Sequence, residues 1–476
     1  MVATTLATTC CLALSSILPG LVSHPNSFIY NSSQQSYWAL QEVNVSPSCI
    51  VSPKTAQHVS LAVKALSALG TCKFAVHSGG HTPFAGSANV ASGVTIDLAK
   101  LDQITLCGNK TSVAVGPGQK WGSVYSKLQP LGLAVAGGRA ASIGVGGLTL
   151  GGGTFYFASL QGLTCDNVLS FEVVLADGRI VTASASSNAD LFVALKGGSN
   201  NFGIVTTFTF RTFVLGGIWA GDVIYPLSTA GDNIKAFAGF VTAPDFDEKA
   251  SLMQTFGYAA GFSAIVNALV YAEPVVNPPA LQIFTGVQPQ LSSSMAVTTL
   301  NETAAALDAS SPKGFYQILT SISIVTSIPT LQKVFDIWNA SVPAVADIPG
   351  MVWSITTQPI NNAVLAKTVA PGNSLGLPTT APTGSFIIVE LAATWSDAGD
   401  SVFVTAAANQ LMANIKDAAK ALGSFNRYID LNHATTGQDP IAGYGSESKT
   451  KLLAASMKYD PKGVFQALVP GGFKLN

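Results

Sequence analysis

One segment dominates the sequence: Val76-His77-Ser78-Gly79-Gly80-His81-Thr82-Pro83-Phe84-Ala85-Gly86-Ser87, at residues 76–87. It begins as a strand and then turns through two glycines. Successive backbone N–H groups in such a turn form a nest for pyrophosphate oxygens, and glycine lets a ligand come close to the main chain. Two of the five histidines of the chain lie in this loop. The segment therefore predicts a phosphate-binding turn that carries a functional histidine.

A second glycine cluster occupies residues 137–153 and reads Gly137-Gly138-Arg139-Ala140-Ala141-Ser142-Ile143-Gly144-Val145-Gly146-Gly147-Leu148-Thr149-Leu150-Gly151-Gly152-Gly153. A dinucleotide-binding G-x-G-x-x-G motif should follow a strand directly and open a helix. Three consecutive glycines do not continue as a helix, although Asp166 has about the right spacing for the acidic residue of that motif. The cluster fits a backbone-lined wall against a flat or extended cofactor better.

The composition excludes several classes of protein. The chain has 476 residues, of which 48% are hydrophobic and 10% are charged, with 24 basic and 25 acidic side chains. An ordinary soluble domain is about 25% charged. A near-neutral chain offers no basic patch to nucleic acid, and its apolar content excludes intrinsic disorder. Because no apolar run reaches the roughly 18–20 residues that span a bilayer, we expect no membrane partner either.

The pattern of short segments changes along the chain, and the length predicts two or three domain-sized units. From residue 214 to about 425 the glycine clusters vanish, and longer apolar strands alternate with helices, as in a separate α/β unit. After about 425 short elements and turns return. Expected strands are Cys49–Val51, Phe74–His77, Val94–Leu98, Ser112–Val115, Ile204–Phe210, Gly261–Tyr271, Met351–Thr357 and Ser385–Trp395, with a hairpin of Phe171–Leu175 and Arg179–Thr182. Expected helices are Thr55–Leu69, Trp121–Leu131 and Leu191–Lys196.

The N-terminal region leaves two alternatives open. Leu6–Val22 resembles the apolar core of a secretory signal, but it lacks a basic start and Pro19-Gly20 interrupts it. The spacing of Cys11, Leu14, Ile17 and Leu18 fits an amphipathic helix equally well.

The cysteines also leave two alternatives. Five of the six lie within the first 107 residues, and none forms a C-x-x-C pair that would suggest zinc. They predict either one or two disulfides in an oxidising compartment or buried thiols. We expect a protein of the secretory pathway, with the cytoplasm as the alternative.

Taken in order, these motifs make the chain resemble the FAD-linked oxidases of the vanillyl-alcohol oxidase superfamily, in particular the fungal relatives of berberine bridge enzyme. The resemblance implies an α+β fold with two domains. Residues 1–213 and 426–476 would form a two-part FAD-binding domain. Residues 214–425 would form an inserted α/β substrate domain, in which helices cover an antiparallel sheet. The matching motifs are Cys11-x-x-Leu14 with Leu18-Pro19-Gly20, Pro47-x-Cys49-Ile50-Val51-x-Pro53, Ser78-Gly79-Gly80-His81, Gly116-Pro117-Gly118 with Trp121, Gly144-Val145-Gly146-Gly147 with Gly151-Gly152-Gly153, Asp166-Asn167-Val168, Leu195-Lys196-Gly197-Gly198 with Asn201-Phe202-Gly203-Ile204-Val205, Leu431-Asn432, and Lys458-Tyr459-Asp460-Pro461.

The resemblance also implies the cofactor and its site. FAD would be bonded covalently to His81 through its 8α-methyl group, which anchors the cofactor and raises its reduction potential. Loop 78–82 and the wall 144–153 would hold the pyrophosphate and the isoalloxazine, and the regions 166–168 and 203–205 the adenosine end and the surroundings of the ring. A Cys11–Cys72 disulfide is implied as well, and no metal. The implied cofactor-binding residues are His77, Ser78, Gly79, Gly80, His81, Thr82, Gly86, Ser87, Gly138, Ala141, Ser142, Gly144, Val145, Gly147, Leu148, Gly152, Asn167, Val168, Gly203, Ile204 and Asn432.

Four positions depart from the family pattern. Ala140 stands where related enzymes have a cysteine that forms a second flavin bond, so a single bond is expected. Ile143 replaces the valine that is thought to gate oxygen, and its extra methylene would crowd O₂. His77 replaces an arginine, and His433 replaces the tyrosine of a Leu-Asn-Tyr motif.

The candidate catalytic residues are His433, Glu390 and Asn432. His433 suits a general base because its unperturbed pKa is about 6.5; a packing substitution is the alternative. Glu390 stands alone in an apolar strand, where burial would raise its pKa and let it accept a proton; a solvated position at the edge is the alternative. Trp353 and Trp395 either line the pocket or pack in the core.

The resemblance therefore predicts a covalent FAD-dependent oxidoreductase. A base would deprotonate the substrate, hydride would pass to the flavin, and O₂ would take up two electrons to give H₂O₂. Since charges are few, we expect a small, largely neutral alcohol, phenol or natural-product intermediate as substrate, and a monomer or weak dimer. The alternatives are a carbohydrate oxidase of the same superfamily, a flavin-loaded cyclase or pericyclic catalyst, and a non-catalytic binder.

Overall fold

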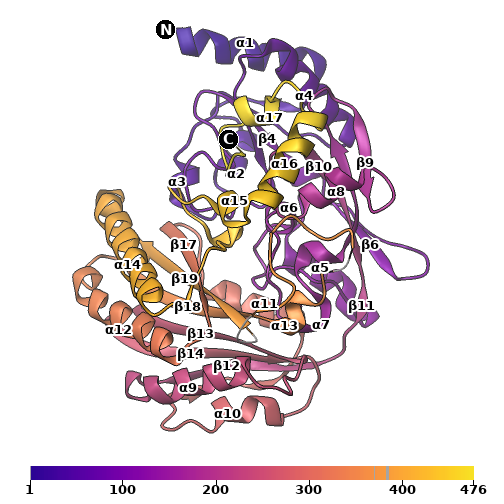
Figure 1. Cartoon of the computed structure of the whole chain (residues 1–476). Coiled ribbons are helices and arrows are strands. Elements are labelled where there is room, and N and C mark those ends of the chain that lie inside the picture. The colour runs from indigo at the N-terminus through magenta and orange to yellow at the C-terminus, as the bar shows by residue number, and fades with distance from the viewer. Residues whose placement is uncertain (1, 369, 382–384, 476) are drawn as a thin grey trace.

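The computed structural model describes residues 2–368, 370–381 and 385–475, and it combines many helices with several β-sheets (Figure 1). The predicted α+β class is confirmed. Within these ranges the strands form sheets of four, five, two and nine strands, and the nine-stranded sheet is antiparallel throughout. No helix of the described ranges is long and apolar enough to cross a membrane.

Two smaller sheets form the part of the molecule that carries the first glycine loop. The four-stranded sheet has the order β1 (Val22–Ser23), β2 (Cys49–Val51), β4 (Val94–Asp97) and β3 (Phe74–His77), and β4 runs parallel to both β2 and β3. The antiparallel five-stranded sheet has the order β5 (Ile104–Leu106), β6 (Ser112–Val115), β10 (Ile204–Arg211), β8 (Val168–Val174) and β9 (Ile180–Ser184). Strand β3 therefore delivers the glycine loop at its carboxyl end.

Helix α4 (Ala56–Leu69) connects the parallel strands β2 and β3 and shows why this local fold forms. The side chain of Thr55 accepts a hydrogen bond from the backbone N–H of His58 and caps the helix. Gly70 ends it with a φ of +65°, which glycine adopts without steric cost. Val59, Val63 and Leu66, which share the predicted apolar face, are fully buried.

The large sheet lies in the lower half of Figure 1, and one of its faces is apolar. Helices α9 (Ala230–Val241), α12 (Ile328–Val345) and α14 (Ser401–Ala421) pack on this face, where Phe256, Ile355 and Leu391 are fully buried. The strand order is β15 (Ser292–Ser293), β12 (Ile218–Tyr225), β14 (Phe262–Tyr271), β13 (Ala250–Ala259), β18 (Val352–Asn361), β19 (Ser385–Trp395), β17 (Tyr316–Val325) and β20 (Phe425–Asn426), with β16 (Ala296–Thr298) also paired to β12.

The remaining elements connect and flank these sheets. Strands β7 (Leu133–Ala134) and β11 (Phe213–Val214) form the two-stranded sheet. The further helices are α1 (Val2–Ile17), α2 (Phe28–Gln34), α3 (Leu40–Val43), α5 (Trp121–Leu128), α6 (Val145–Leu150), α7 (Ala158–Gln161), α8 (Ala189–Leu195), α10 (Gln282–Thr285), α11 (Leu300–Ala309), α13 (Asn362–Leu365), α15 (Pro440–Gly443), α16 (Ser446–Tyr459) and α17 (Val464–Ala467).

The C-terminal segment returns to the N-terminal sheets, as the yellow ribbon among the purple elements shows (Figure 1). The backbone N–H of Phe74 on β3 donates to the carbonyl of Leu468 over 2.8 Å. A Cβ at Gly471 would lie 2.1 Å from the carbonyl oxygen of Gly86. The chain end therefore packs directly on the glycine loop.

Most predicted elements appear with shifts of one to a few residues at their ends, and one is divided. The helix predicted at Trp121–Leu131 ends as α5 at Leu128 and continues as a 3₁₀ turn over Gln129–Leu131. Pro130 lacks the backbone N–H that an α-helix would need there. Gly132, with a φ of +67°, closes the turn.

Two disulfides fasten α1 to the body of the molecule. They join Cys10 to Cys72 and Cys11 to Cys49. The implied Cys11–Cys72 pairing is therefore wrong, while the expectation of one or two bridges near the N-terminus is confirmed. Consecutive helix residues point about 100° apart, so Cys10 faces Cys72 in the connection between α4 and β3, while Cys11 faces Cys49 of β2. Leu14 and Leu18 are buried, as their spacing predicts, but Ile17 is 42% exposed.

The pairing can be tested with cysteine variants. We expect Cys10→Ala to make Cys72 accessible to iodoacetamide after denaturation while Cys49 stays protected, and Cys11→Ala to free Cys49 instead. Each change should cost about 2–5 kcal/mol of unfolding free energy, since each removes a bridge that constrains the unfolded chain. Peptide mass spectrometry and denaturant unfolding measure both effects. Alkylation of Cys72 in the Cys11→Ala variant alone would support the other pairing.

Candidate functional site

The two glycine clusters touch each other backbone to backbone. A Cβ built on Gly79 would lie 2.3 Å from the Cα of Gly144, and a Cβ on Gly144 would lie 2.4 Å from the Cα of Gly79. The Oγ of Ser78 donates to the carbonyl of Pro117 over 2.5 Å and fixes the start of the loop. A Cβ on Gly146 would lie 2.6 Å from that Oγ. Larger residues at Gly79 or Gly144 would therefore separate the loop from the wall.

The wall itself is held by α5. The backbone N–H groups of Trp121 and Gly122 donate to the carbonyls of Ile143 and Ala141, each over 3.0 Å. Gly138 packs so closely on the Trp121 indole that a Cβ would lie 2.5 Å from a ring carbon. Along α6, by contrast, a Cβ on Gly147 would meet nothing within 4 Å. The wall is thus packed on one side and open at Gly147.

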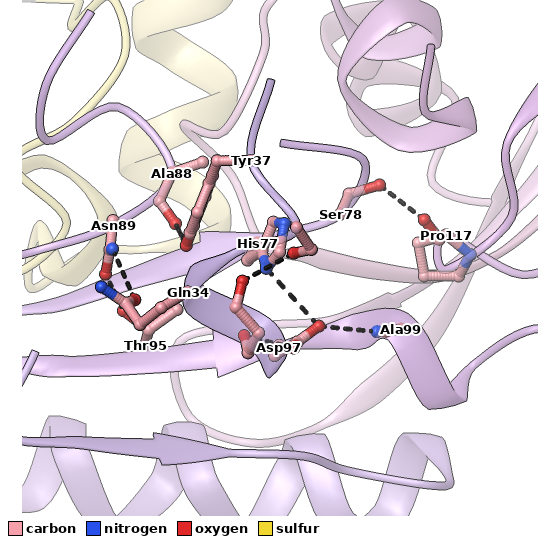
Figure 2. Close-up of polar contacts among 12 residues, drawn as sticks. Gln34, Tyr37, His77, Ser78, Ala88, Asn89, Thr95, Asp97, Ala99 and Pro117 are labelled. Atoms are coloured by element: carbon pink, nitrogen blue, oxygen red, sulfur yellow. Dashed lines mark hydrogen bonds and ion pairs between the residues drawn. The ribbon is translucent and has the colours of Figure 1, made fainter. Parts of the chain in front are cut away.

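His77 supports the loop from below (Figure 2). It is 2% exposed, its ring stacks on that of Tyr37 at 4.1 Å, and its Nδ1 lies 3.6 Å from Oδ1 of Asp97. Burial alone would raise the pKa of Asp97, but the charge of His77 and hydrogen bonds from Ser33 and the backbone N–H of Ala99 lower it below its ordinary value. A Cβ on Gly80 would lie 2.7 Å from the Nε2 of His77.

His81, at the end of the loop, has an unpartnered nitrogen. Its Nε2 atom is buried and has no hydrogen-bond partner. The ring stacks on the indole of Trp38 at 4.1 Å with an interplanar angle of 12°. Burial is the main cause that lowers the pKa of His81 to about 4, with the charges of Lys120 and His433 acting in the same direction and that of Asp308 opposing them. The imidazole is therefore neutral at physiological pH.

The rest of the first loop is bound to Glu42 of α3. The backbone N–H groups of Gly86 and Ala88 donate to the carboxylate of Glu42 over 3.1 and 2.6 Å. Burial raises the pKa of Glu42 to about 7, although these backbone donors oppose the shift. A carboxyl group of the chain itself thus occupies the backbone donors of Gly86 and Ala88. Thr82, in the same loop, is half-buried.

The regions 166–168 and 203–205, predicted for the adenosine end and the surroundings of the ring, lie at opposite ends of one strand ladder. Val168 begins β8 and pairs with Phe210, whereas Ile204 begins β10 and pairs with Val174, at the other end of the same ladder. At about 3.4 Å per residue the two ends are roughly 20 Å apart. A Cβ on Gly203 would lie 2.7 Å from the carbonyl oxygen of Val174, so this glycine is needed for strand packing.

Three other predicted positions are engaged by protein groups. Asn167 donates to the carbonyls of Gln161 and Leu163 over 2.9 Å and accepts from Nη2 of Arg211 over 2.8 Å, so its amide is fully used. The backbone N–H groups of Ala141 and Ser142 donate to the carbonyl of Ala304 and to Oδ1 of Asp308 on α11, each over 3.1 Å.

Asn432 fastens the C-terminal turn to the wall. Its Nδ2 donates to the carbonyl of Leu148 on α6 over 3.1 Å, and a Cβ on Gly151 would lie 2.2 Å from its Oδ1. Gly152 and Gly153 follow with φ values of +108° and +81°, which favour glycine and end the helix as the sequence predicts. The turn therefore brings the next residue, His433, to the glycine wall.

His433 lies between two carboxylates. Its Nδ1 is 3.2 Å from Oδ2 of Asp430, and its Nε2 is 3.7 Å from Oε2 of Glu390. Burial would lower the pKa of His433, but the charges of Glu390 and Asp430 and the hydrogen bond with Asp430 outweigh it and raise the pKa. Burial would raise the pKa of Asp430, yet the charge and hydrogen bond of His433 lower it. Glu390 also accepts a hydrogen bond from Nε2 of Gln358.

This arrangement resolves the alternatives for Glu390 and the tryptophans. Glu390 faces His433 with its side chain 12% exposed and is not a solvated edge residue. Trp353 and Trp395 lie on the opposite, helix-covered face, where their indole N–H groups donate to Ser341 and Ser401.

Asp430, Gln358 and Trp38 are partners of the candidate residues that were not predicted from the sequence. Asp430 precedes His433 by three residues, a spacing that could have shown it. Gln358 meets Glu390 through the register of the strands β18 and β19. Trp38 stacks on His81, which lies more than forty residues further along the chain. No local signal in the sequence identifies either contact.

Comparison with known proteins gives consistent results. The FAD binding domain family model matches residues 47–184. The oligopeptidase PhomG' of Diaporthe leptostromiformis is 38% identical over 95% of this chain, which spans only 36% of that relative. The FAD-dependent monooxygenase sdcF of Emericella nidulans is 34% identical over 99% of both chains. The chain is an FAD-linked oxidoreductase of the vanillyl-alcohol oxidase superfamily.

Other members of this superfamily are similar in sequence or fold. The bifunctional solanapyrone synthase of Alternaria solani is 32% identical over 95% of this chain and 87% of its own length. The solved structure of 6-hydroxy-D-nicotine oxidase from Arthrobacter nicotinovorans has a TM-score of 0.80 at 20% identity, covering 96% of this chain and 98% of its own. A glucooligosaccharide oxidase from Acremonium strictum, described with 6-S-cysteinyl, 8α-N1-histidyl FAD, has a TM-score of 0.77 at 19% identity over 97% and 98%.

The residues of this FAD-linked oxidoreductase fit a bound FAD. The neutral His81 has a buried nitrogen without a partner, and Gly147 of the adjoining wall faces open space.

Two glycine variants separate packing from cofactor contact. Gly144→Ala should lower both unfolding free energy, by about 1–3 kcal/mol, and flavin content, because the new Cβ overlaps the loop. Gly147→Ala should keep or slightly raise the stability of the flavin-free protein, since Ala is the better helix former, but lower its flavin content. The ratio of flavin to protein absorbance and the apoprotein Tm measure these effects. Wild-type flavin content and Tm in Gly144→Ala would contradict the backbone contact.

Proposed function

We propose that this FAD-dependent enzyme holds FAD through a covalent bond to His81 and oxidises a small organic alcohol, phenol or natural-product intermediate, with O₂ as acceptor and H₂O₂ as product. The observation that carries the proposal is the buried Nε2 of His81, which has no hydrogen-bond partner among the described residues. Asn432, the neighbour of His433 in the chain, is fastened to Leu148 of the glycine wall. The wall thus adjoins both the proposed flavin attachment loop and the turn that carries a proton acceptor.

His81 has the properties that a flavin linkage requires. A neutral imidazole retains a nucleophilic lone pair, and the low pKa keeps His81 neutral across the physiological range. Stacking on Trp38 fixes the ring plane. Ala140 stands at the expected position of a second, cysteinyl attachment, so we propose one covalent bond.

His433 is the proposed general base, with Glu390 beside it. When Nδ1–H of His433 donates to Asp430, Nε2 carries the lone pair and can accept the proton of a substrate hydroxyl. Bound FAD supplies the two-electron acceptor for the substrate hydride. Asn432 acts as a positioning residue, because its amide is used on Leu148.

We also propose the division into an FAD-binding part at residues 1–213 and 426–476 and a substrate part at 214–425. One apolar cluster contains only residues from Trp219 to Ala419, and a second combines residues up to Ile204 with residues from Val464 to Val469. The third cluster contains residues of both parts and joins them. The two disulfides support a site of action in the oxidising secretory pathway.

A flavin-loaded cyclase is a second candidate, and similarity to the bifunctional solanapyrone synthase favours it. Anaerobic addition of substrate distinguishes the two functions, because only an oxidation bleaches the flavin absorbance. A peroxide-release screen of the holoenzyme over alcohols, sugars and aromatic polyketides tests the oxidase function. Absence of peroxide with every substrate that binds would reject it.

The covalent bond makes a simple prediction about colour. Acid-precipitated wild-type protein should remain yellow, while His81→Ala should release its flavin into the supernatant. His24→Ala, which removes an exposed histidine, is the matched control and should keep a yellow pellet. A colourless wild-type pellet would reject attachment of the flavin to any residue.

The pH profile tests the role of His433. The base works only when neutral, so its raised pKa places the acidic limb of kcat above the ordinary histidine range. Asp430→Asn removes a charge that raises this pKa and should move the limb to lower pH by about one unit or more. His433→Gln should lower kcat roughly a hundred- to ten-thousandfold.

The exposed Asp439→Asn serves as the charge-matched control and should leave the limb in place. An unchanged limb in a folded Asp430→Asn enzyme would exclude His433 as the titrating base.

A further inference from the structure

A small, partly open cavity lies between the glycine wall and the large sheet, and Arg139 is among its lining residues. The backbone around Arg139 is rigid. The hydroxyl of Tyr125 donates to the carbonyl of Gly138 over 2.7 Å, and that of Tyr156 donates to the carbonyl of Arg139 over 3.1 Å. Gly138 also packs on the Trp121 indole. The backbone of Arg139 is therefore held in place, and its side chain extends from there to the cavity.

The guanidinium of Arg139 lacks an anionic partner. A guanidinium has five N–H donors, and the structure gives this half-buried one a single hydrogen bond, from Nη1 to the thioether sulfur of Met253 over 2.7 Å. Across the described ranges no carboxylate oxygen comes within 4.0 Å of it. Arg179, by comparison, pairs with Asp177 at 2.6 Å. The nearest interacting carboxylate, Asp430, lies beyond ion-pair distance, and the charge of Arg139 helps to lower its pKa. Most donors of this partly desolvated guanidinium are therefore left for a ligand.

A second unsatisfied group lies in the same cavity. Gln358 is 3% exposed, and its Oε1 has no hydrogen-bond partner, while its Nε2 donates to Glu390. The cavity thus has a cation at Arg139 and a free acceptor at Gln358. Through Glu390 that acceptor adjoins His433, the proposed base.

We propose that Arg139 binds an anionic group of the substrate, a planar anion with two oxygens such as a carboxylate or an ionised 1,3-diketone. The fork of a guanidinium matches two such oxygens, which a single ammonium does not. A hydroxyl or N–H of the same molecule donates to Gln358 and brings the reacting end to His433. This inference rests on the proposed oxidase function and narrows the expectation of a largely neutral substrate, adding one acidic group to an otherwise neutral molecule.

The test is the binding of matched probes to the oxidised holoenzyme by isothermal titration calorimetry. Benzoate is compared with benzamide, and 1,3-cyclohexanedione, ionised as its enolate, with cyclohexanone. We expect each anion to bind about ten- to a hundredfold more tightly than its neutral partner, as one or two charge-assisted hydrogen bonds provide. Stronger discrimination in one pair identifies which anion fits.

Three variants assign the preference. Arg139→Gln should abolish it, and Arg139→Lys should keep part of it. Arg179→Gln, which removes the same charge from an exposed ion pair, should keep all of it. Equal binding of the paired probes, a preference that survives in Arg139→Gln, or no binding of any probe at millimolar concentration would overturn the proposal.

The outcomes also separate this inference from the proposed function. Anion preference without peroxide formation from any substrate leaves the Arg139 site standing and rejects the oxidase. Peroxide formation from neutral substrates, unaffected by Arg139→Gln, leaves the oxidase standing and rejects the anion site.

Discussion

The contact between the Cα atoms of Gly79 and Gly144 is the constraint on which the site depends. Two glycines without side chains let a loop from the parallel sheet rest directly on a wall that precedes α6. The positions of the other parts of the site depend on this contact. His81 ends the loop, α6 continues the wall, and Asn432 attaches the C-terminal turn to α6. Since backbone packed on backbone has few alternative arrangements, the relative position of the two histidines is fixed by the main chain and not by flexible side chains.

The two faces of the large sheet have different roles. One face packs in the apolar core, and the other carries residues of the candidate site. The face under α9, α12 and α14 is filled with aliphatic and aromatic side chains and buries both Trp353 and Trp395. Residues of the opposite face include Glu390 and Thr356, which are paired across β19 and β18. Alternation along a strand makes this possible, because successive side chains point to opposite faces. Strand β19 can therefore present the carboxylate of Glu390 to His433 on one face, while the side chains that alternate with it pack in the core on the other face.

The sequence predicted the elements better than it predicted their partners. The glycine clusters, the strand Ser385–Trp395 and the α+β class follow from local patterns and from the order of family motifs. Contacts that depend on long-range register did not follow. Glu42, for example, accepts hydrogen bonds from the backbone of Ala88 and of Gly86, a residue that the resemblance assigns to cofactor binding. Asn167 and Gly203 belong to two consecutive motifs of the family, yet they lie at opposite ends of the ladder that β8 and β10 form. The implied disulfide pairing was wrong for a similar reason, because adjacent cysteines on a helix face different partners.

The return of the C-terminal segment to the glycine loop has a consequence for biosynthesis. Gly471 packs on the carbonyl of Gly86, and Leu468 accepts a hydrogen bond from the start of β3, nearly four hundred residues earlier in the chain. At roughly 5–20 residues per second, the loop leaves the ribosome tens of seconds before these supports exist. The nascent chain must therefore keep a glycine-rich, weakly ordered segment open during that interval. Cofactor capture becomes a late event, which belongs to the finished polypeptide and not to its growing N-terminal half.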